Sequence, residues 1–374
     1  MFVRKLGRMG TVEEFRKILL EISNNAEISS IMVLACDANG FTPKDVNPIL
    51  KLVTKPLFGG IFPEIIFGNE KLTKGTIIVG FSNKQDIQII PDLSAKNIDY
   101  DDVLDKIFPQ VDNYKTMFVF VDGFAQRISA LIDSLFNIFG LEFNYVGGGA
   151  GSLSLQQKPC IFTSEGLLQN CAVLAMTNCQ SGVGVAHGWK SIAGPFRITE
   201  SDRNIIKTLD WKPAFQVYKK IVEEHSGEKF TDDNFFNIAK AYPFGIAKLG
   251  TERIIRDPLM LGEDDALICV GEVPEESFVD IMNGNLESLI AAAGDALLKA
   301  EKSYDGSLDG SGLLFIDCIS RVLFLEDDFK KELEVIHKKG IPLIGVLSIG
   351  EIANSGKDFL EFYNKTAVVS ILGS

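Results

Sequence analysis

The stretch "MFVFVDGFAQRISALIDSLFNIFGLEFNYVGGGAG", residues 117–151, decides the fold class of this chain. The apolar and aromatic run at its start is typical of a buried strand. Apolar residues then recur at helical spacing from Ile128 to Phe139, and Gly140 ends the helix that this pattern predicts. A second apolar run leads into Gly147–Gly149. The stretch therefore reads strand, helix, strand and glycine-rich turn, which is typical of an α/β protein.

The same order of elements occurs three times along the chain. The first copy runs from "IMVLACD" through "PLFGGIFPE" to "KGTIIVGF", and the third runs from "LLFIDCISR" through "PLIGVLSIGEI" to "NKTAVVSIL". If the repeat is genuine, Gly59-Gly60, Gly147–Gly149 and the glycines of 345–350 form comparable turns that line a shared cleft. Ordinary α/β alternation explains the order equally well, so both interpretations stay open.

We expect a mixed α/β fold of two packed domains, in which helices flank mixed sheets. The stretch "GPFRITESDRNIIKTLDWKPA" is polar and punctuated by proline, and it predicts a boundary between residues 205 and 206. The first domain then spans 28–205 and the second spans 206–374. Residues 1–27 are predicted to form an N-terminal helical extension.

Composition and charge limit the classes of function. The chain has 374 residues and a formal net charge of -13, and a chain this acidic repels nucleic acid and anionic lipid. No apolar run is long enough to span a bilayer, and the first residues lack the apolar core of a secretory signal. The six cysteines form no CxxC pair, which favours buried thiols in a reducing compartment. We therefore expect a cytoplasmic protein that neither binds nucleic acid nor inserts into a membrane.

The glycine run does not fit a nucleotide site. A dinucleotide fingerprint needs a glycine at the sixth position and a helix directly after it, but the sixth position from Gly147 is Ser152. The following residues reach Pro159 too soon for a helix, and no Gly-Lys-Ser/Thr ending of a P-loop occurs. The glycines are instead expected to allow positive φ, or the close approach of a backbone or a ligand. The three histidines lie far apart and predict no metal site.

Side chains at predicted strand ends are the candidate site residues. Arg321 and Glu351 each follow an apolar strand, so they could bind a ligand's carboxylate and ammonium groups, or form an internal ion pair. Cys318 is a candidate nucleophile because Arg321 is near, although an inert buried thiol fits its surroundings better. His187 could be an axial haem ligand or a hydrogen-bonded structural residue. No GxSxG elbow or paired-carboxylate signature occurs, so the sequence does not require an enzyme.

Several motifs in this order resemble the FIST family, from about residue 30 to the end. They are "VGGGAGS", "GVGVAHGWKSIAGPFRIT", "YPFGI", "RDPLML", "DCISR", "GIPLIGVLSIGEIAN" and "YNKTAVV". The resemblance implies FIST N-terminal and C-terminal domains, which are cytoplasmic sensory domains for small ligands, amino acids among them. Such domains are associated with chemoreceptors, histidine kinases and cyclic-dinucleotide enzymes, and some relatives bind haem and sense nitric oxide. The motif residues that we expect to bind ligand are Gly147, Gly148, Gly149, Gly151, His187, Trp189, Tyr242, Cys318, Arg321, Gly350 and Glu351.

We therefore expect a non-catalytic sensor with its ligand between the two domains and no metal or cofactor. Arg321 would bind a carboxylate, Glu351 would bind an ammonium or hydroxyl group, and Trp189 would supply an apolar wall. Because no output segment is evident, the signal would pass to a separate partner protein. Three alternatives stay open: a haem-based gas sensor that uses His187, an enzyme that uses Cys318 or a convergent acidic site, and a scaffold without a ligand.

Overall fold

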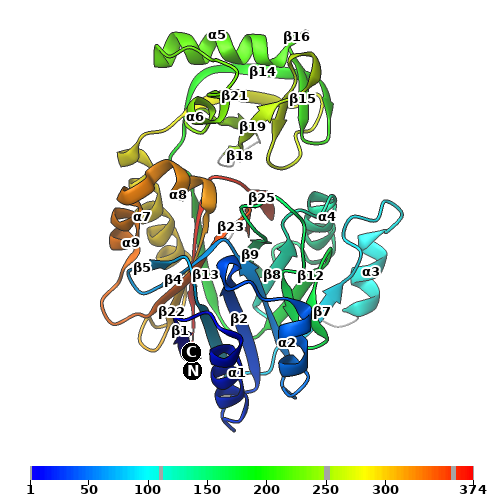
Figure 1. Ribbon diagram of the computed structural model, residues 1–374, viewed down its shortest axis with the longest axis vertical. Helices are drawn as coiled ribbons and strands as arrows, with labels where there is room; N and C mark the ends of the chain where they lie inside the picture. Colours follow the sequence, from blue (N-terminus) through cyan, green and yellow to red (C-terminus); the bar gives the residue numbers. More distant parts are fainter. Residues whose placement is uncertain (1, 109–112, 248–252, 355–358, 374) are drawn as a thin grey trace.

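The computed structural model describes residues 2–108, 113–247, 253–354 and 359–373. Three sheets form one large body, and a fourth sheet lies above it (Figure 1). This arrangement confirms the predicted two-part, mixed α/β fold. None of the helices in the described ranges combines the length and the apolar character that crossing a bilayer requires.

The body consists of three modules that share one order of elements, with one additional helix, α9, in the third. The first module contains β1 (Phe2–Gly7), α1 (Val12–Ser23), β2 (Ser30–Cys36), α2 (Pro43–Leu50), β3 (Leu57–Phe62), β4 (Glu64–Phe67), β5 (Glu70–Leu72) and β6 (Thr76–Phe81). The second contains β7 (Asp86–Ile90), α3 (Tyr100–Ile107), β8 (Thr116–Asp122), α4 (Ile128–Phe139), β9 (Asn144–Ala150), β10 (Ile161–Thr163), β11 (Gly166–Leu168) and β12 (Ala172–Thr177). The third contains β13 (Ser181–Ala186), α7 (Leu286–Ser303), β22 (Gly312–Cys318), α8 (Ile319–Leu325), α9 (Phe329–Ile336), β23 (Leu343–Ser348), β24 (Glu351–Ala353), β25 (Glu361–Tyr363) and β26 (Ala367–Leu372).

Each sheet is completed by a hairpin from another module. The strand orders are β1-β6-β2-β3-β10-β11, β7-β12-β8-β9-β24-β25 and β13-β26-β22-β23-β4-β5. In every sheet the third and fourth strands are parallel, and the fifth and sixth strands form the borrowed hairpin. The first module lends its hairpin to the third, the second lends to the first, and the third lends to the second. This cyclic exchange interlocks the modules and shows that the repeat in the sequence is a structural repeat.

The three glycine clusters occupy the same register in the three sheets. Gly59 pairs with Val33, Gly147 pairs with Val119, and Gly345 pairs with Phe315. A Cβ atom on these glycines would lie 1.9, 1.7 and 2.2 Å from the carbonyl oxygen of the paired residue. The predicted equivalence is thus confirmed. Gly350 lies in a turn between β23 and β24, as predicted, but the prediction of turns is wrong for the three paired glycines. The glycines lie inside β3, β9 and β23, because no larger residue lets these parallel strands approach their neighbours so closely.

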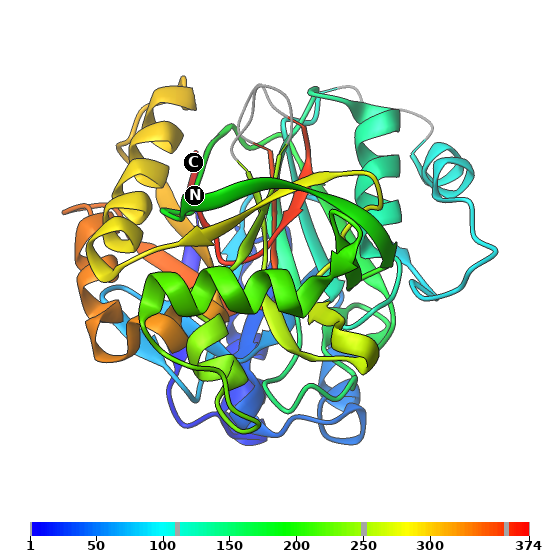
Figure 2. The same ribbon diagram turned by 90° about the horizontal axis from the view of Figure 1, so that it is seen from above.

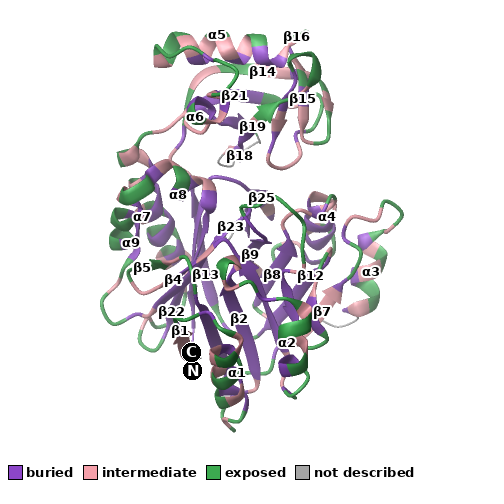
Figure 3. Cartoon of the chain, viewed as in Figure 1, coloured by how far each residue is buried: buried purple, intermediate pink, exposed green. Residues whose placement is uncertain are grey.

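The inner faces of the sheets share one apolar core, and helices lie on the outside. Phe58 of the first module stacks near Phe118 and Phe120 of the second, with ring centroids 5.5 and 6.1 Å apart. From above, α7 (gold) and α4 (blue-green) flank opposite sides of the strands (Figure 2). Buried residues accordingly fill the strands, whereas the outer helix faces are exposed (Figure 3). The segment expected to be an N-terminal helical extension adds strand β1 as well as α1 to this body.

The fourth sheet is an insertion in the third module, between β13 and α7. Its elements are β14 (Lys190–Asp202), β15 (Ile205–Leu209), β16 (Lys212–Pro213), α5 (Ala214–Ser226), α6 (Phe235–Ala239), β17 (Phe244–Ile246), β18 (Ile254–Arg256), β19 (Pro258–Leu261), β20 (Leu267–Cys269) and β21 (Phe278–Asn283). We call this part, residues 190–283, the inserted domain. It has its own apolar core and connects to the body through β14 and β21, which pair from Lys190 opposite Asn283. The expected boundary at 205/206 lies within this sheet, because the polar stretch forms the β14–β15 hairpin rather than a linker.

Candidate functional site

A cavity of about 520 Å³ lies between the body and the inserted domain. The body contributes the turn after β8, the loop after β9, the start of α8 and the turn between β23 and β24. The inserted domain contributes the β14–β15 turn, α6, and residues of β19 and β20. The cavity therefore lies at the carboxyl ends of the parallel strands, where α/β folds usually bind ligands.

Two of the predicted site residues, Cys318 and Gly350, line this cavity. Gly350 has a φ of 96°, and a Cβ on it would lie 2.3 Å from the ring of Phe362. The turn that contains Gly350 packs on β9, since Gly149 and Gly350 share a 2.8 Å hydrogen bond from N–H to carbonyl. Only glycine fits at both positions, so Gly149 supports the cavity floor from below.

The remaining glycines of the run lie farther from the cavity. Gly147 and Gly148 are inside β9, and a Cβ on Gly148 would lie 2.9 Å from the carbonyl oxygen of Gly350. Gly151 has a φ of 155° and lies against the ring of Phe124, which does line the cavity. The glycine run therefore allows backbones to approach one another beneath the site, and these three residues are absent from the cavity wall.

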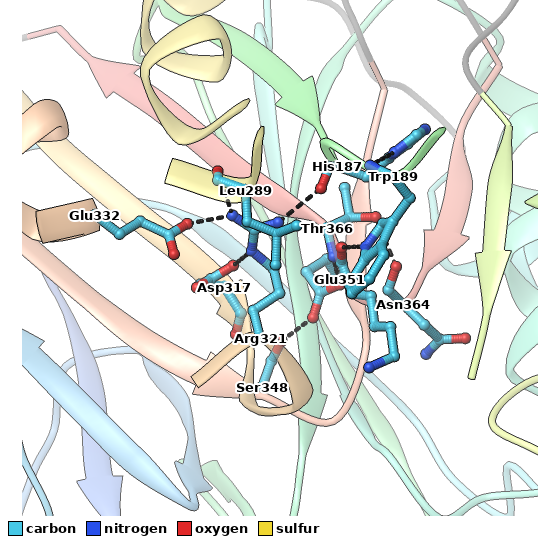
Figure 4. A network of polar contacts seen from close by, with 11 residues as sticks. His187, Trp189, Leu289, Asp317, Arg321, Glu332, Ser348, Glu351, Asn364 and Thr366 are labelled. Carbon is cyan, nitrogen blue, oxygen red and sulfur yellow. Dashed lines mark hydrogen bonds and ion pairs between the residues drawn. The ribbon is translucent and has the colours of Figure 1, made fainter. Parts of the chain in front are cut away.

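Glu351 lies directly behind the cavity floor in β24. Its side chain is fully buried, and it accepts hydrogen bonds from the Ser348 hydroxyl at 2.7 Å and the Thr366 N–H at 3.3 Å (Figure 4). Burial raises the pKa of this carboxyl to about 8, although hydrogen bonds from Ser348 and Cys318 oppose the shift. Glu351 is thus largely neutral at pH 7 and can donate or accept a hydrogen bond.

Cys318 ends β22 and touches both the cavity and Glu351. Burial raises the pKa of its thiol well above the ordinary value, and the charge of Glu351 adds to this effect. The thiol is therefore protonated at neutral pH, and a protonated thiol is a poor nucleophile. This environment fits a binding surface better than a reactive cysteine.

Arg321 does not reach the cavity, in contrast to its predicted role as a carboxylate ligand. Its guanidinium is fully buried and forms ion pairs with Asp317, at 2.9 Å, and Glu332, rather than with Glu351. It also donates to the carbonyl oxygens of His187 at 2.8 Å and Leu289 at 3.0 Å (Figure 4). Those two residues flank the chain connections to the inserted domain, so Arg321 holds both connections against α8.

His187 does not fit the role of an axial haem ligand. Its Nδ1 accepts a 2.9 Å hydrogen bond from the Trp189 N–H, so the proton of the neutral ring is on Nε2. Burial and, to a smaller extent, the positive charge of Arg321 together lower the pKa of His187 to about 4. Neither ring nitrogen therefore offers a free lone pair, and His187 is outside the cavity lining. The geometry matches the structural role that the sequence left open.

Trp189 and Tyr242 also lie outside the cavity. The Trp189 indole donates to the Lys365 carbonyl at 3.1 Å and packs against Phe324 of α8. It therefore supports the connection to the inserted domain instead of forming a ligand wall. Tyr242 lies in the inserted domain, where its hydroxyl is 3.0 Å from Nδ1 of His225.

A buried ion pair that was not predicted from the sequence joins the inserted domain to the body. Lys365 of the body lies 3.2 Å from Asp257 and donates to the Lys240 carbonyl at 2.9 Å. Next to it, Arg256 donates to the Phe362 carbonyl at 3.1 Å and to Asn364 at 3.3 Å. Arg256 and Asp257 belong to the motif "RDPLML", and Asn364 and Lys365 belong to "YNKTAVV". The charged and polar residues next to apolar sequence in these motifs were the signal that could have identified the contact.

Within the described ranges, no group of three or more His, Cys, Asp or Glu side chains is placed so that it could hold a metal ion.

Comparison with known sequences identifies two domains. The FIST N domain profile matches residues 32–212, and the FIST C domain profile matches residues 214–354.

One curated relative is an uncharacterized protein of Methanocaldococcus jannaschii, MJ1623. It is 22% identical over 291 residues, which cover 70% of this chain and 54% of that protein. The chain thus spans about half the length of this relative, and the likeness assigns no function by itself.

Proposed function

The chain belongs to the FIST family, whose domains are sensory domains, and we propose that it is a non-catalytic sensor that binds a small organic ligand between the body and the inserted domain. The cavity of about 520 Å³ carries this proposal. Its size lies in the usual range for small-molecule sites, and it lies between two separately folded parts. We further propose that the protein acts in the cytoplasm and signals to a separate protein, such as a histidine kinase, chemoreceptor or cyclic-dinucleotide enzyme.

The position of the cavity supports a sensing role because both parts contribute to its wall. A ligand that contacts both parts stabilises the arrangement in which they lie close together. The ligand then binds this arrangement more tightly than one in which the two parts lie farther apart, and only a difference in affinity of this kind can carry a signal. Helix α8 links ligand binding to the arrangement of the two parts. Cys318 and Ser320 at its start line the cavity, and Arg321 holds both chain connections to the inserted domain.

The chemistry of the cavity floor supports binding rather than catalysis. Burial raises the pKa of both Cys318 and Glu351, so neither side chain carries a charge that could drive nucleophilic attack at neutral pH. An amino acid remains a candidate ligand, but Arg321 is not its carboxylate partner, because its donors already bind Asp317, Glu332 and two carbonyls.

The test is thermal unfolding with a panel of amino acids, carboxylates, amines and neutral aromatics. A ligand present at one hundred times its dissociation constant stabilises the folded state by about 2.7 kcal/mol and raises Tm. The Leu323→Trp variant would place an indole in the cavity and obstruct it, whereas Leu298→Trp changes an exposed leucine of α7 outside it. We expect the first variant to abolish the Tm increase and the second to retain it. A panel without any Tm increase, or an increase that survives Leu323→Trp, would contradict the proposal.

A further inference from the structure

The cavity wall contains four large apolar side chains that are partly exposed to solvent. Leu153, Leu155, Met260 and Leu323 line it and are 48%, 54%, 47% and 38% exposed. These residues come from the loop after β9, from β19 and from α8, so separate parts of the fold bring them together. Exposed apolar groups that gather around a cavity mark a surface that binds another apolar group. A small polar ligand would leave this surface in water.

The loop after β9 holds its two leucines in place. Leu155 has a φ of 55°, which is rare for a residue with a branched side chain. The loop is fastened on both sides, since the Ser152 hydroxyl donates to Asp37 at 2.6 Å and the Gln157 amide donates to Asp122 at 2.8 Å. Backbone strain of this kind is typical of functional sites, and here it presents an apolar side chain to the cavity.

The cavity wall carries an arginine whose side chain is partly free to bind a ligand. Arg203 lines the cavity, its side chain is 57% exposed, and its nearest described partners are distant: Gln126 at 3.4 Å and Asp202 at 3.6 Å. The charged residues that line the cavity are Arg203 and Glu272. An acidic group of a ligand could therefore bind Arg203 without displacing a close ion pair.

A second guanidinium lies directly behind the wall. Arg256 is buried and donates to backbone carbonyls and to Asn364. Burial lowers its pKa to about 10, and the negative charges of Glu361 and Glu272 oppose this shift. Gly271 separates it from the cavity, and a Cβ on that glycine would lie 3.1 Å from the Arg256 Nε. An anion in the cavity would experience this charge at short range.

We propose that the ligand is an amphipathic organic acid, with its acidic group toward Arg203 and its apolar body against Leu153, Leu155, Met260 and Leu323. This inference rests on the proposed function and specifies its ligand class. The apolar body replaces water on the exposed leucines, and the acidic group forms an ion pair with the Arg203 guanidinium. Zwitterionic amino acids with short side chains would satisfy only the second requirement.

The test uses butanoate, hexanoate and octanoate, with octanamide and octylamine as neutral and cationic analogues, and glutamate and alanine as polar probes. Titration calorimetry should show affinity for the acids rising by up to about fourfold per methylene group. Octanamide and octylamine should bind at least about tenfold more weakly than octanoate, because they cannot form the charged pair with Arg203. Affinity that is independent of chain length, or equal for octylamine and octanoate, would overturn the inference.

Two variants separate the charge from the apolar contact. Arg203→Gln should remove the preference for octanoate over octanamide but retain the chain-length dependence. Arg197→Gln is the matched control, because Arg197 also lies in the inserted domain but pairs with Glu276 outside the cavity. If glutamate or alanine binds and Leu323→Trp abolishes that binding while octanoate does not bind, this inference fails and the proposed function stands. If no probe binds, both fail.

Discussion

Ile161 and Glu351 occupy the same register position in two equivalent sheets, since Ile161 pairs with Gly60 and Glu351 pairs with Gly148. Ile65 holds this position in the remaining sheet. The fold therefore accepts an aliphatic side chain here twice, and the third module replaces it with a buried carboxyl. Burying a carboxyl costs free energy that an isoleucine does not, so structural stability does not explain Glu351. Its place behind the cavity floor indicates a functional reason.

We predict that Glu351→Gln changes how stability depends on pH. The pKa of this carboxyl rises from the ordinary 4.5 to about 8 in the folded protein, so between these values the folded state binds a proton that the unfolded chain has released. Stability from this group is full below that window and falls as pH rises through it. A glutamine side chain does not titrate, so the variant should lose less stability than the wild type across the window.

Urea unfolding below and above the window measures this difference. Asp317, Cys318 and Arg321 are present in both proteins, so their titration largely cancels in the comparison. Glu13→Gln, at an exposed position of α1, is the control and should keep the wild-type pH dependence. Equal pH dependence for wild type and Glu351→Gln would show that Glu351 is not the titrating group.

The second prediction concerns the buried charge of Arg321. Replacing it by methionine leaves Asp317 and Glu332 buried without their cation, and two carbonyls without a donor. The free energy of unfolding should fall by about 3–5 kcal/mol, as for other buried ion pairs that lose one partner. Arg197→Met removes an exposed pair and should cost at most about 1 kcal/mol. Denaturant titration of both variants measures the contrast, and similar costs would refute the assigned role.

The third prediction concerns the glycine shared by the modules. Gly147→Ala would place a Cβ 1.7 Å from the Val119 carbonyl oxygen, so β9 must move away from β8. This displacement should cost about 3 kcal/mol or more, because the sheet interior cannot relax around a new atom. Gly262→Ala is the control, since its nearest contact would be an ordinary 3.4 Å, and it should cost less than about 1 kcal/mol. Similar midpoints in urea would contradict the close approach.

The strand–helix–strand order and the equivalence of the glycines could be predicted from the sequence because both depend on local patterns. The cyclic hairpin exchange could not, since Phe67 pairs with Ile344 and no local pattern encodes a partner so distant. Strand β1 was missed for the same reason, because the strand forms only by pairing with β6.

The candidate site was predicted only in part. Cys318 was identified as a candidate nucleophile near Arg321, and Gly350 was identified by the resemblance to the FIST motifs; both line the cavity. Glu351 was identified by the rule that ligands bind where apolar strands end. Arg321 follows the same rule, but its partner Glu332 lies on α9, and the packing of α9 was not readable from spacing. Leu155 was missed because an isolated leucine in a loop is common on protein surfaces, and only the assembled cavity shows its neighbours.

The last prediction concerns the contact between the inserted domain and the body. Asp257→Asn leaves the buried ammonium of Lys365 without its anion, whereas Asp257→Asn combined with Lys365→Met removes both charges. The single variant should therefore weaken the contact more than the double variant, with a cost of about 3–5 kcal/mol. Hydrogen exchange should report the loss at β18 and β26, next to the contact, rather than at β2 in the far module. Exchange that increases equally at β2 would indicate global destabilisation and would exclude a specific role for the pair in holding the inserted domain.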